Sequence, residues 1–100
     1  MTFNPNDYVS ASESIILSGN VKEYVNGQFV KLILTNKKMI MAGDDYLNII
    51  PLNCISKINY FGAHGRIDIS TSGDTKAYLY YRDNPSWYNE IVKEISKRIG

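Results

Sequence analysis

The stretch VKLILTNKKMIMAG, from Val30 to Gly43, decides the fold of this chain. Two apolar runs flank a polar four-residue turn, Thr35 to Lys38. Apolar runs on both sides of a short polar turn are typical of a β-hairpin. The stretch therefore predicts two antiparallel strands, over residues 28–35 and 38–42.

Further apolar runs, separated by turn residues, extend this pattern in both directions. Asn26-Gly27 favours a two-residue hairpin because both positions tolerate positive φ. Pro51 predicts the end of a strand, since proline cannot donate to the ladder. A bulge is expected near Gly19-Asn20 in the first strand. The predicted strands cover residues 15–25, 28–35, 38–42, 46–50, 55–61, 66–70 and 76–82.

The spacing of the apolar residues then changes from two to about four. Trp87, Ile91, Ile95 and Ile99 predict one face of a helix, and Asn84-Pro85 supplies a cap residue followed by proline at the first helical position. Seven antiparallel strands followed by one helix predict a mainly β domain of the α+β class. We expect a seven-stranded antiparallel barrel or two orthogonal sheets, capped by the C-terminal helix. Residues 1–13 are expected to form an N-terminal arm or short helix, and residues 14–100 the domain.

Composition restricts the classes of function. The 100 residues carry a net charge of +1, with 11 basic and 10 acidic residues. The basic residues are scattered, which argues against a nucleic-acid partner. One cysteine, Cys54, excludes an intramolecular disulfide and a multi-cysteine zinc site. With no apolar run near about 18 residues and no secretory signal pattern, the expected location is cytoplasmic, or peripheral at the inner face of the membrane.

Several local patterns, arriving in order, resemble the pleckstrin-homology-like (PH-like) superfamily, in particular its GRAM and bacterial PH domains. They are Glu13 before the first strand, the hairpin LILTNKKMIM, the segment IPL at 50–52, the pair Ile55 and Ile58, and Trp87. The resemblance implies two sheets of four and three strands, closed by a C-terminal helix. Members of this superfamily bind phosphoinositides or peptides, are recruited to membranes or act as scaffolds, so the fold alone does not assign a function.

Two further comparisons concern membranes. Lipid-binding PH domains place a lysine before the first hairpin turn and a Lys/Arg-x-Arg pattern after it. This chain has Lys22 and Lys31 at those places, but Ile33 stands where the second cation is expected. In length and in the sequence of its hairpin, the chain also resembles an immunity protein against the bacteriocin sublancin. That protein carries a membrane anchor. A bacteriocin-immunity role is therefore part of the membrane hypothesis.

The residues that could be catalytic or bind a metal are not part of a recognisable motif in the sequence. His64 lies in a glycine-bracketed turn, Cys54 is expected to be a small core residue, and Asp44-Asp45 is expected to be a hairpin turn. Neither a nucleophile with its base nor the spaced oxygen ligands of a calcium loop can be named. We expect no enzyme, no cofactor and no bound metal.

The outward faces of the strands suggest the binding surface. If Val30, Leu32, Leu34, Met39 and Met41 point inward, alternation turns Phe29, Ile33 and Ile40 outward. The alternative is that the N-terminal arm covers these outward groups. The first hypothesis is a non-enzymatic PH-like module that docks a protein or peptide, or a second copy, on outward apolar groups. The alternative is peripheral binding to anionic lipid through a lysine edge, which salt would weaken. The first surface comprises Phe29, Ile33, Ile40, Tyr78 and Tyr80, and the second Lys22, Lys31, Lys37 and Lys38.

Overall fold

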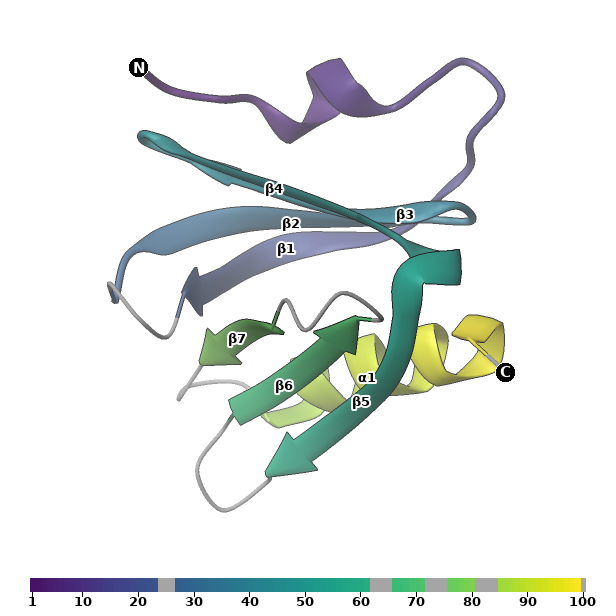
Figure 1. Cartoon of the computed structure of the whole chain (residues 1–100). Helices are drawn as coiled ribbons and strands as arrows, with labels where there is room; N and C mark the ends of the chain where they lie inside the picture. Colours follow the sequence, from purple (N-terminus) through teal and green to yellow (C-terminus); the bar gives the residue numbers. More distant parts are fainter. Residues whose placement is uncertain (24–26, 62–65, 72–75, 81–84, 100) are drawn as a thin grey trace.

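The structure is a computed structural model that describes residues 1–23, 27–61, 66–71, 76–80 and 85–99. It is mainly β with one C-terminal helix, as predicted (Figure 1). In chain order the elements are the 3-10 helix η1 (Pro5–Tyr8), strands β1 (Ile15–Glu23), β2 (Phe29–Thr35), β3 (Lys38–Gly43) and β4 (Tyr46–Pro51), the 3-10 helix η2 (Leu52–Cys54), strands β5 (Ile55–Phe61), β6 (Arg66–Thr71) and β7 (Lys76–Tyr80), and helix α1 (Pro85–Ile99).

The hairpin predicted from residues 30–43 forms as β2 and β3, with Leu34 opposite Met39 and Lys31 opposite Ala42. Thr35 closes its turn, because its hydroxyl accepts hydrogen bonds from the backbone N–H groups of Lys37 (3.1 Å) and Lys38 (3.0 Å). Such local bonds replace the ladder bonds that a turn lacks. The predicted strand bounds agree with the structure to within one or two residues wherever the structure describes them.

The strands run in the order β4-β3-β2-β1-β7-β6-β5, and each pairs with its neighbours antiparallel. Figure 1 shows β1 to β4 as one layer and β5 to β7 as a second. The layers are joined by a short pairing of β1 with β7, where Lys22 lies opposite Tyr80 and Glu23 opposite Leu79.

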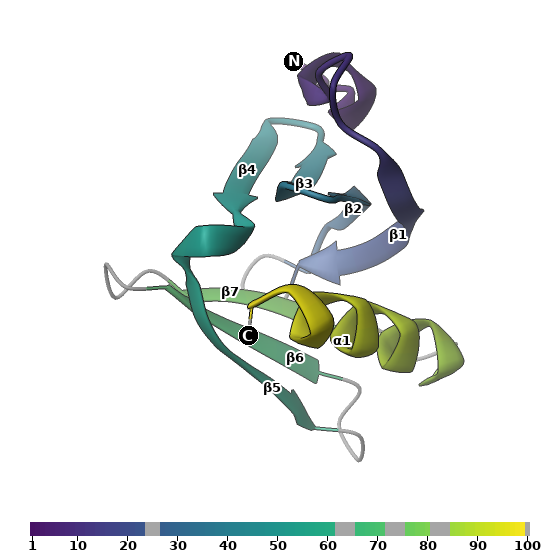
Figure 2. The same cartoon turned by 90° about the vertical axis from the view of Figure 1, so that its right-hand side faces the viewer.

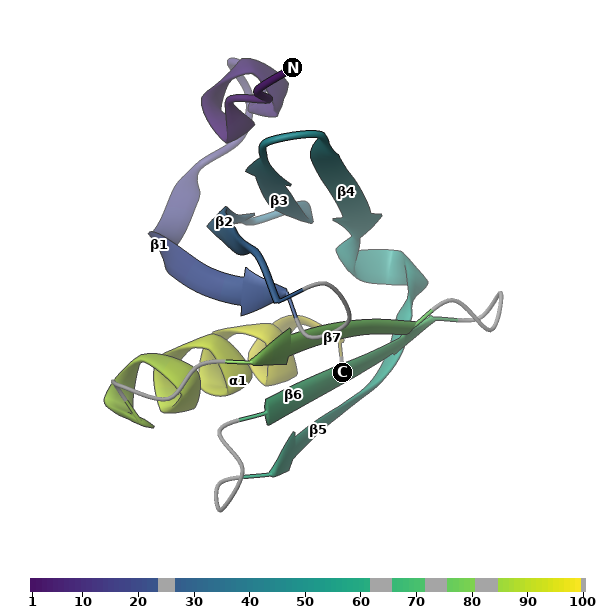
Figure 3. The ribbon, with the colours of Figure 1, turned by 90° about the vertical axis from the view of Figure 1, so that its left-hand side faces the viewer.

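Of the two expected architectures, the closed barrel is wrong for the described strands, because β4 and β5 end the sheet order and do not pair with each other. The chain passes between them through Pro51, which has no N–H to donate, and through η2. Helix α1 contacts β5 and η2 and lies across one end of the space between the layers (Figures 2 and 3). The sheet is open between β4 and β5, and the helix packs against β5 and η2 beside this opening.

The prediction of a bulge at Gly19-Asn20 is also wrong. Gly19 lies opposite Leu32 and Asn20 opposite Lys31 in a continuous register. The shift in β1 occurs earlier, between Ile15 and Leu17. That is where the chain leaves the arm and enters the sheet, and bulges are frequent at such margins.

The core lies between the two layers and under α1. Its members from β2 and β3 are those predicted to point inward, and Ile91 and Ile95 from α1 pack with them. The described part of the apolar face of the helix is therefore buried, as its spacing predicts, and the side chain of Trp87 lies outside the described part of the structure. The buried core residues of the central hairpin are Val30, Leu32, Leu34, Met39 and Met41.

Residues 1–13 form an arm across the other face of this hairpin (Figure 1). Helix η1 contacts β2 and β3, and Pro5 is buried there. Asn4 caps η1 by accepting a hydrogen bond from the backbone N–H of Asn6 (3.0 Å). The β1–β4 layer thus has the main core on one side and the arm on the other. Among the described helices, none is long and apolar enough to cross a membrane.

Candidate functional site

The arm removes most of the apolar surface that the sequence suggested. Ile33 and Ile40 do point away from the main core, but they are only 1% and 0% exposed. The prediction that these two side chains are exposed is therefore wrong, because η1 covers β2 and β3. Phe29 is 68% exposed, as predicted, and the Lys22 amine lies 5.7 Å from its ring centre. The predictions for Tyr78 and Tyr80 concern side chains outside the described part of the structure.

Glu13 fastens the arm to the β2–β3 turn. Its carboxylate lies 2.9 Å from the Lys38 amine, accepts a hydrogen bond from the Thr35 hydroxyl, and accepts two more from Ser10. The side chain is only 2% exposed. Hydrogen bonding from Thr35, and then from Lys38 and Ser10, outweighs the cost of burial and lowers the pKa of Glu13 to about 2.

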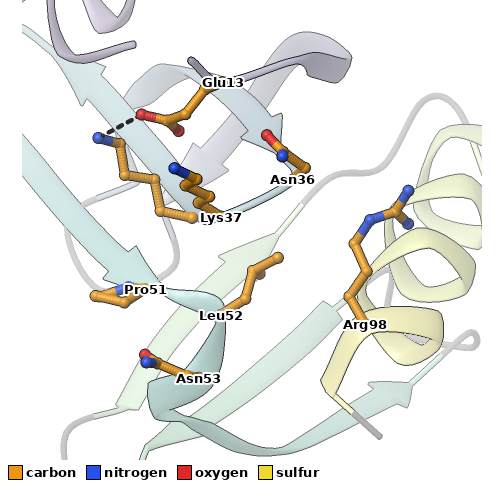
Figure 4. Close-up of a pocket in the computed structure, with 8 residues that line it drawn as sticks. Glu13, Asn36, Lys37, Pro51, Leu52, Asn53 and Arg98 are labelled. Carbon is orange, nitrogen blue, oxygen red and sulfur yellow. Dashed lines mark ion pairs between the residues drawn. The ribbon is translucent and has the colours of Figure 1, made fainter. Parts of the chain in front are cut away.

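A hollow of about 610 Å³ opens beside this fastening (Figure 4). It lies where the β2–β3 turn, the end of β4 with η2, and the last turn of α1 meet. Figure 4 shows Asn36 and Lys37 on one side and Arg98, from α1, on the other. Its lining residues are Glu13, Asn36, Lys37, Lys38, Pro51, Leu52, Asn53 and Arg98.

The hollow is positively charged, since its lining holds three cations and one carboxylate. Lys38 is paired with Glu13, and Arg98 lies 3.1 Å from Glu94 one helical turn earlier. Burial opposes the ionisation of Glu94, but hydrogen bonds from Arg98 and Lys97 prevail and lower the pKa of Glu94. The Lys37 amine is 3.4 Å from the Ser12 hydroxyl, a neutral partner, so its charge is available to an anion.

The four lysines of the predicted lysine edge lie at separate places in the structure. Lys37 and Lys38 line the basic hollow, whereas Lys31 lines a second hollow of about 420 Å³ near Phe29, next to the arm. Lys31 lies four residues before Thr35, where the turn with Lys37 and Lys38 begins, which is a distance of about 13 Å along β2. Lys22 sits over Phe29. The four lysines therefore do not form one patch.

Strand β4 carries apolar residues that were not singled out from the sequence. Leu47 and Ile49 lie opposite Ala42 and Ile40 and share their outer face, but they remain 36% and 37% exposed. The period of two in Tyr46-Leu47-Asn48-Ile49-Ile50 already indicated this face. Arg98 was missed for another reason: only the packing of α1 brings it to the β2–β3 turn.

Cys54 and the pair Asp44-Asp45 also lie at separate places in the described part of the structure. Cys54 is half-buried, its sulfur 3.5 Å from the Asn53 side-chain oxygen. Asp44 and Asp45 form the β3–β4 turn, as predicted, with Asp45 at a φ of 52°. His64 lies outside the described residues. The described part of the chain holds no group of three or more His, Cys, Asp or Glu side chains that could bind a metal ion.

No family model matches the chain, and no curated protein matches it significantly.

Proposed function

We propose that this protein is a non-enzymatic binding module of the PH-like type, which docks an extended segment of a protein partner along the free edge of β4. The backbone groups at an edge strand can pair with another strand, and side chains of alternate residues then add specificity. The docking residues are Leu47 and Ile49.

The observation that carries this proposal is the position of Leu47 and Ile49. Both lie on an edge strand, and both are partly exposed beside an apolar face that the arm otherwise covers. A strand added to β4 would bury them together with the free backbone groups of that edge. The covered Ile33 and Ile40 cannot serve a partner while the arm is in place.

The PH-like assignment is supported by the order of the elements. An antiparallel four-strand layer precedes a three-strand layer, and a helix packs last over the space between them. Glu13, part of the resemblance, holds the arm to the LILTNKKMIM hairpin. These features agree with the fold that the resemblance implies, although the sheet is open between β4 and β5.

Site-specific photocrosslinking in cells that express the protein tests this function. A benzophenone amino acid at position 49 should give adducts with a partner, and Leu47→Lys should remove them. The matched control is the same amino acid at position 61, because Phe61 is an exposed residue of β5, the other edge strand. Equal adducts at both positions, or none at position 49, would refute docking on β4.

A second candidate function is peripheral binding to anionic lipid at the basic hollow. It is favoured by one observation: Arg98 lines the same hollow as Lys37 and Lys38. Each exposed cation near an anionic surface contributes about 1 kcal/mol, and salt screens this contribution.

Co-sedimentation with vesicles separates the two candidates. Lipid binding requires sedimentation with phosphatidylglycerol vesicles that falls with salt and with Lys37→Glu, but not with Lys31→Glu, a lysine outside the hollow. Equal recovery with neutral phosphatidylcholine vesicles, or none with either, would exclude the lipid function.

A further inference from the structure

The two edges of the sheet differ in their protection against pairing. The edge strand β5 carries Lys57 and a register shift between Ile55 and Lys57, which are features that hinder the addition of another strand. Strand β4 has no charged residue from Tyr46 to Pro51, and the ladder that joins it to β3 has no register shift. Only Pro51, at its end, discourages pairing. β4 is thus the edge suited to receive a strand.

The sequence of β4 is also suited to antiparallel pairing with β4 of a second copy. In an antiparallel pair of two β4 strands with Asn48 at the two-fold axis, Leu47 of one copy lies opposite Ile49 of the other. Both residues belong to the outer face, so four partly exposed apolar side chains would come together. The strand carries no charge, so the two-fold axis brings no like charges face to face.

The charges beyond the two ends of β4 are complementary. The acidic turn Asp44-Asp45 precedes β4, and the basic hollow lies at its other end, where Pro51 and Leu52 line it. The same register places Asp45 of one copy opposite Pro51 of the other, and Asp44 opposite Leu52. An antiparallel pair therefore brings each acidic turn beside Pro51 and Leu52, which line the hollow together with Lys37 and Arg98.

Both acidic side chains are accessible for such a contact. Asp45 is 81% exposed at its side chain, where it contacts the terminal amino group at 2.9 Å, and Asp44 accepts a hydrogen bond from the exposed Thr2 hydroxyl. An exposed ion pair such as that of Asp45 contributes little to stability, so exchanging it for a contact with a basic hollow costs little.

We propose that the strand docked on β4 is that of a second copy of this chain, in a two-fold dimer with Leu47 against Ile49 and the acidic turn of each copy at the basic hollow of the other. This inference rests on the proposed use of the β4 edge and names its occupant. A single strand pair buries a small interface, so the dimer exchanges with monomer.

Sedimentation equilibrium over a concentration series tests the dimer. The mass should rise from one chain to two with concentration, and Leu47→Lys should weaken association at least tenfold. Phe61→Lys, the same kind of change on the other edge strand, should leave association unchanged. Circular dichroism verifies that both variants are folded.

A charge exchange tests the register without touching the apolar contact. Asp44→Lys and Lys37→Asp should each weaken association about three- to tenfold, and the double variant should recover most of the loss. Recovery within one copy is excluded by geometry, because the length of β3 separates these two positions. Asp44 is the better choice for lysine, since Asp45 has a positive φ that disfavours most side chains.

The possible outcomes separate this inference from the proposed function. A chain that stays monomeric at all concentrations overturns the dimer, and so does a dimer that Phe61→Lys breaks but Leu47→Lys does not. A monomer that still gives adducts with another protein at position 49 keeps the docking function and rejects only the second copy as its occupant. A monomer without adducts rejects both.

Discussion

At the scale of single residues, Glu13 joins two parts of the molecule. It is the last residue of the arm, yet all its strong contacts except those with Ser10 are made to the β2–β3 turn. A buried carboxylate is tolerated only when hydrogen bonds and a cation replace its hydration. The Thr35 hydroxyl and the Lys38 amine provide these replacements.

Replacing Glu13 by glutamine should destabilise the fold by about 1–3 kcal/mol, because the Lys38 amine loses its counter-charge and the hydrogen bonds from Ser10 and Thr35 weaken. The free energy of unfolding, from urea titration at pH 7, measures the effect. Glu90→Gln is the matched control, because Glu90 is exposed on α1, and it should change stability by less than about 0.5 kcal/mol. Equal effects of both variants would contradict the role assigned to Glu13.

The same residue predicts a pH dependence. The folded-state pKa of Glu13, about 2, lies below its ordinary value of 4.5, so its ionisation stabilises the fold above pH 4.5. As pH falls from 4.5 toward 2 the unfolded chain binds the proton first, and this stabilisation is lost. The difference in unfolding free energy between the native protein and Glu13→Gln should therefore shrink across that interval in urea titrations. A difference that stays constant from pH 5 to pH 2 would show that Glu13 has an ordinary pKa.

At the scale of elements, the arm explains why the predicted docking surface was wrong. Strand alternation correctly placed Ile33 and Ile40 on the outer face, because side-chain direction follows from the local backbone. Their burial depends on η1, which reaches them from about 30 residues away in the chain. Periodicity predicts which side a residue faces, but it does not show what covers that side.

Removing residues 1–9 tests the covering role of the arm while it keeps Ser10 and Glu13. Uncovering Ile33 and Ile40 should cost about 3–6 kcal/mol, at roughly 1.5–3 kcal/mol for each large apolar side chain. The amides of β2 and β3 should exchange hydrogen faster, and the dye ANS should bind to the exposed face. Unchanged stability and no dye binding would mean that the arm does not shield this face.

At the scale of the whole molecule, the sequence predicted the hairpins and the helix from local turn chemistry and periodicity. The basic hollow was only half predicted, because Lys37 and Lys38 share one turn but Arg98 arrives through the packing of α1. The closed-barrel alternative was wrong for the same reason. Whether the two end strands meet depends on the path of the chain through Pro51 and η2.

Helix α1 joins the two layers into one core, and Ile95 is a fully buried contact in it. Ile95→Ala should therefore destabilise the protein by about 2–5 kcal/mol, through lost burial and the cavity that remains. Ser96→Ala, at the adjacent exposed position, should be neutral or slightly stabilising because alanine favours helices. Thermal unfolding followed by circular dichroism compares the two, and similar midpoints would show that α1 adds little to the core.

The short β1–β7 pairing has a consequence for the time course of folding. It joins Lys22 to Tyr80 and Glu23 to Leu79, across more than half of the chain, whereas β1 to β4 pair through neighbouring turns. Closing so long a loop costs chain entropy before any contact compensates for it, so the meander of β1 to β4 should form first. Substitutions in β2 and β3 should then slow refolding, and those at the β1–β7 junction should mainly speed unfolding, which stopped-flow fluorescence can measure. The opposite pattern would mean that the chain closes its ends before the meander is built.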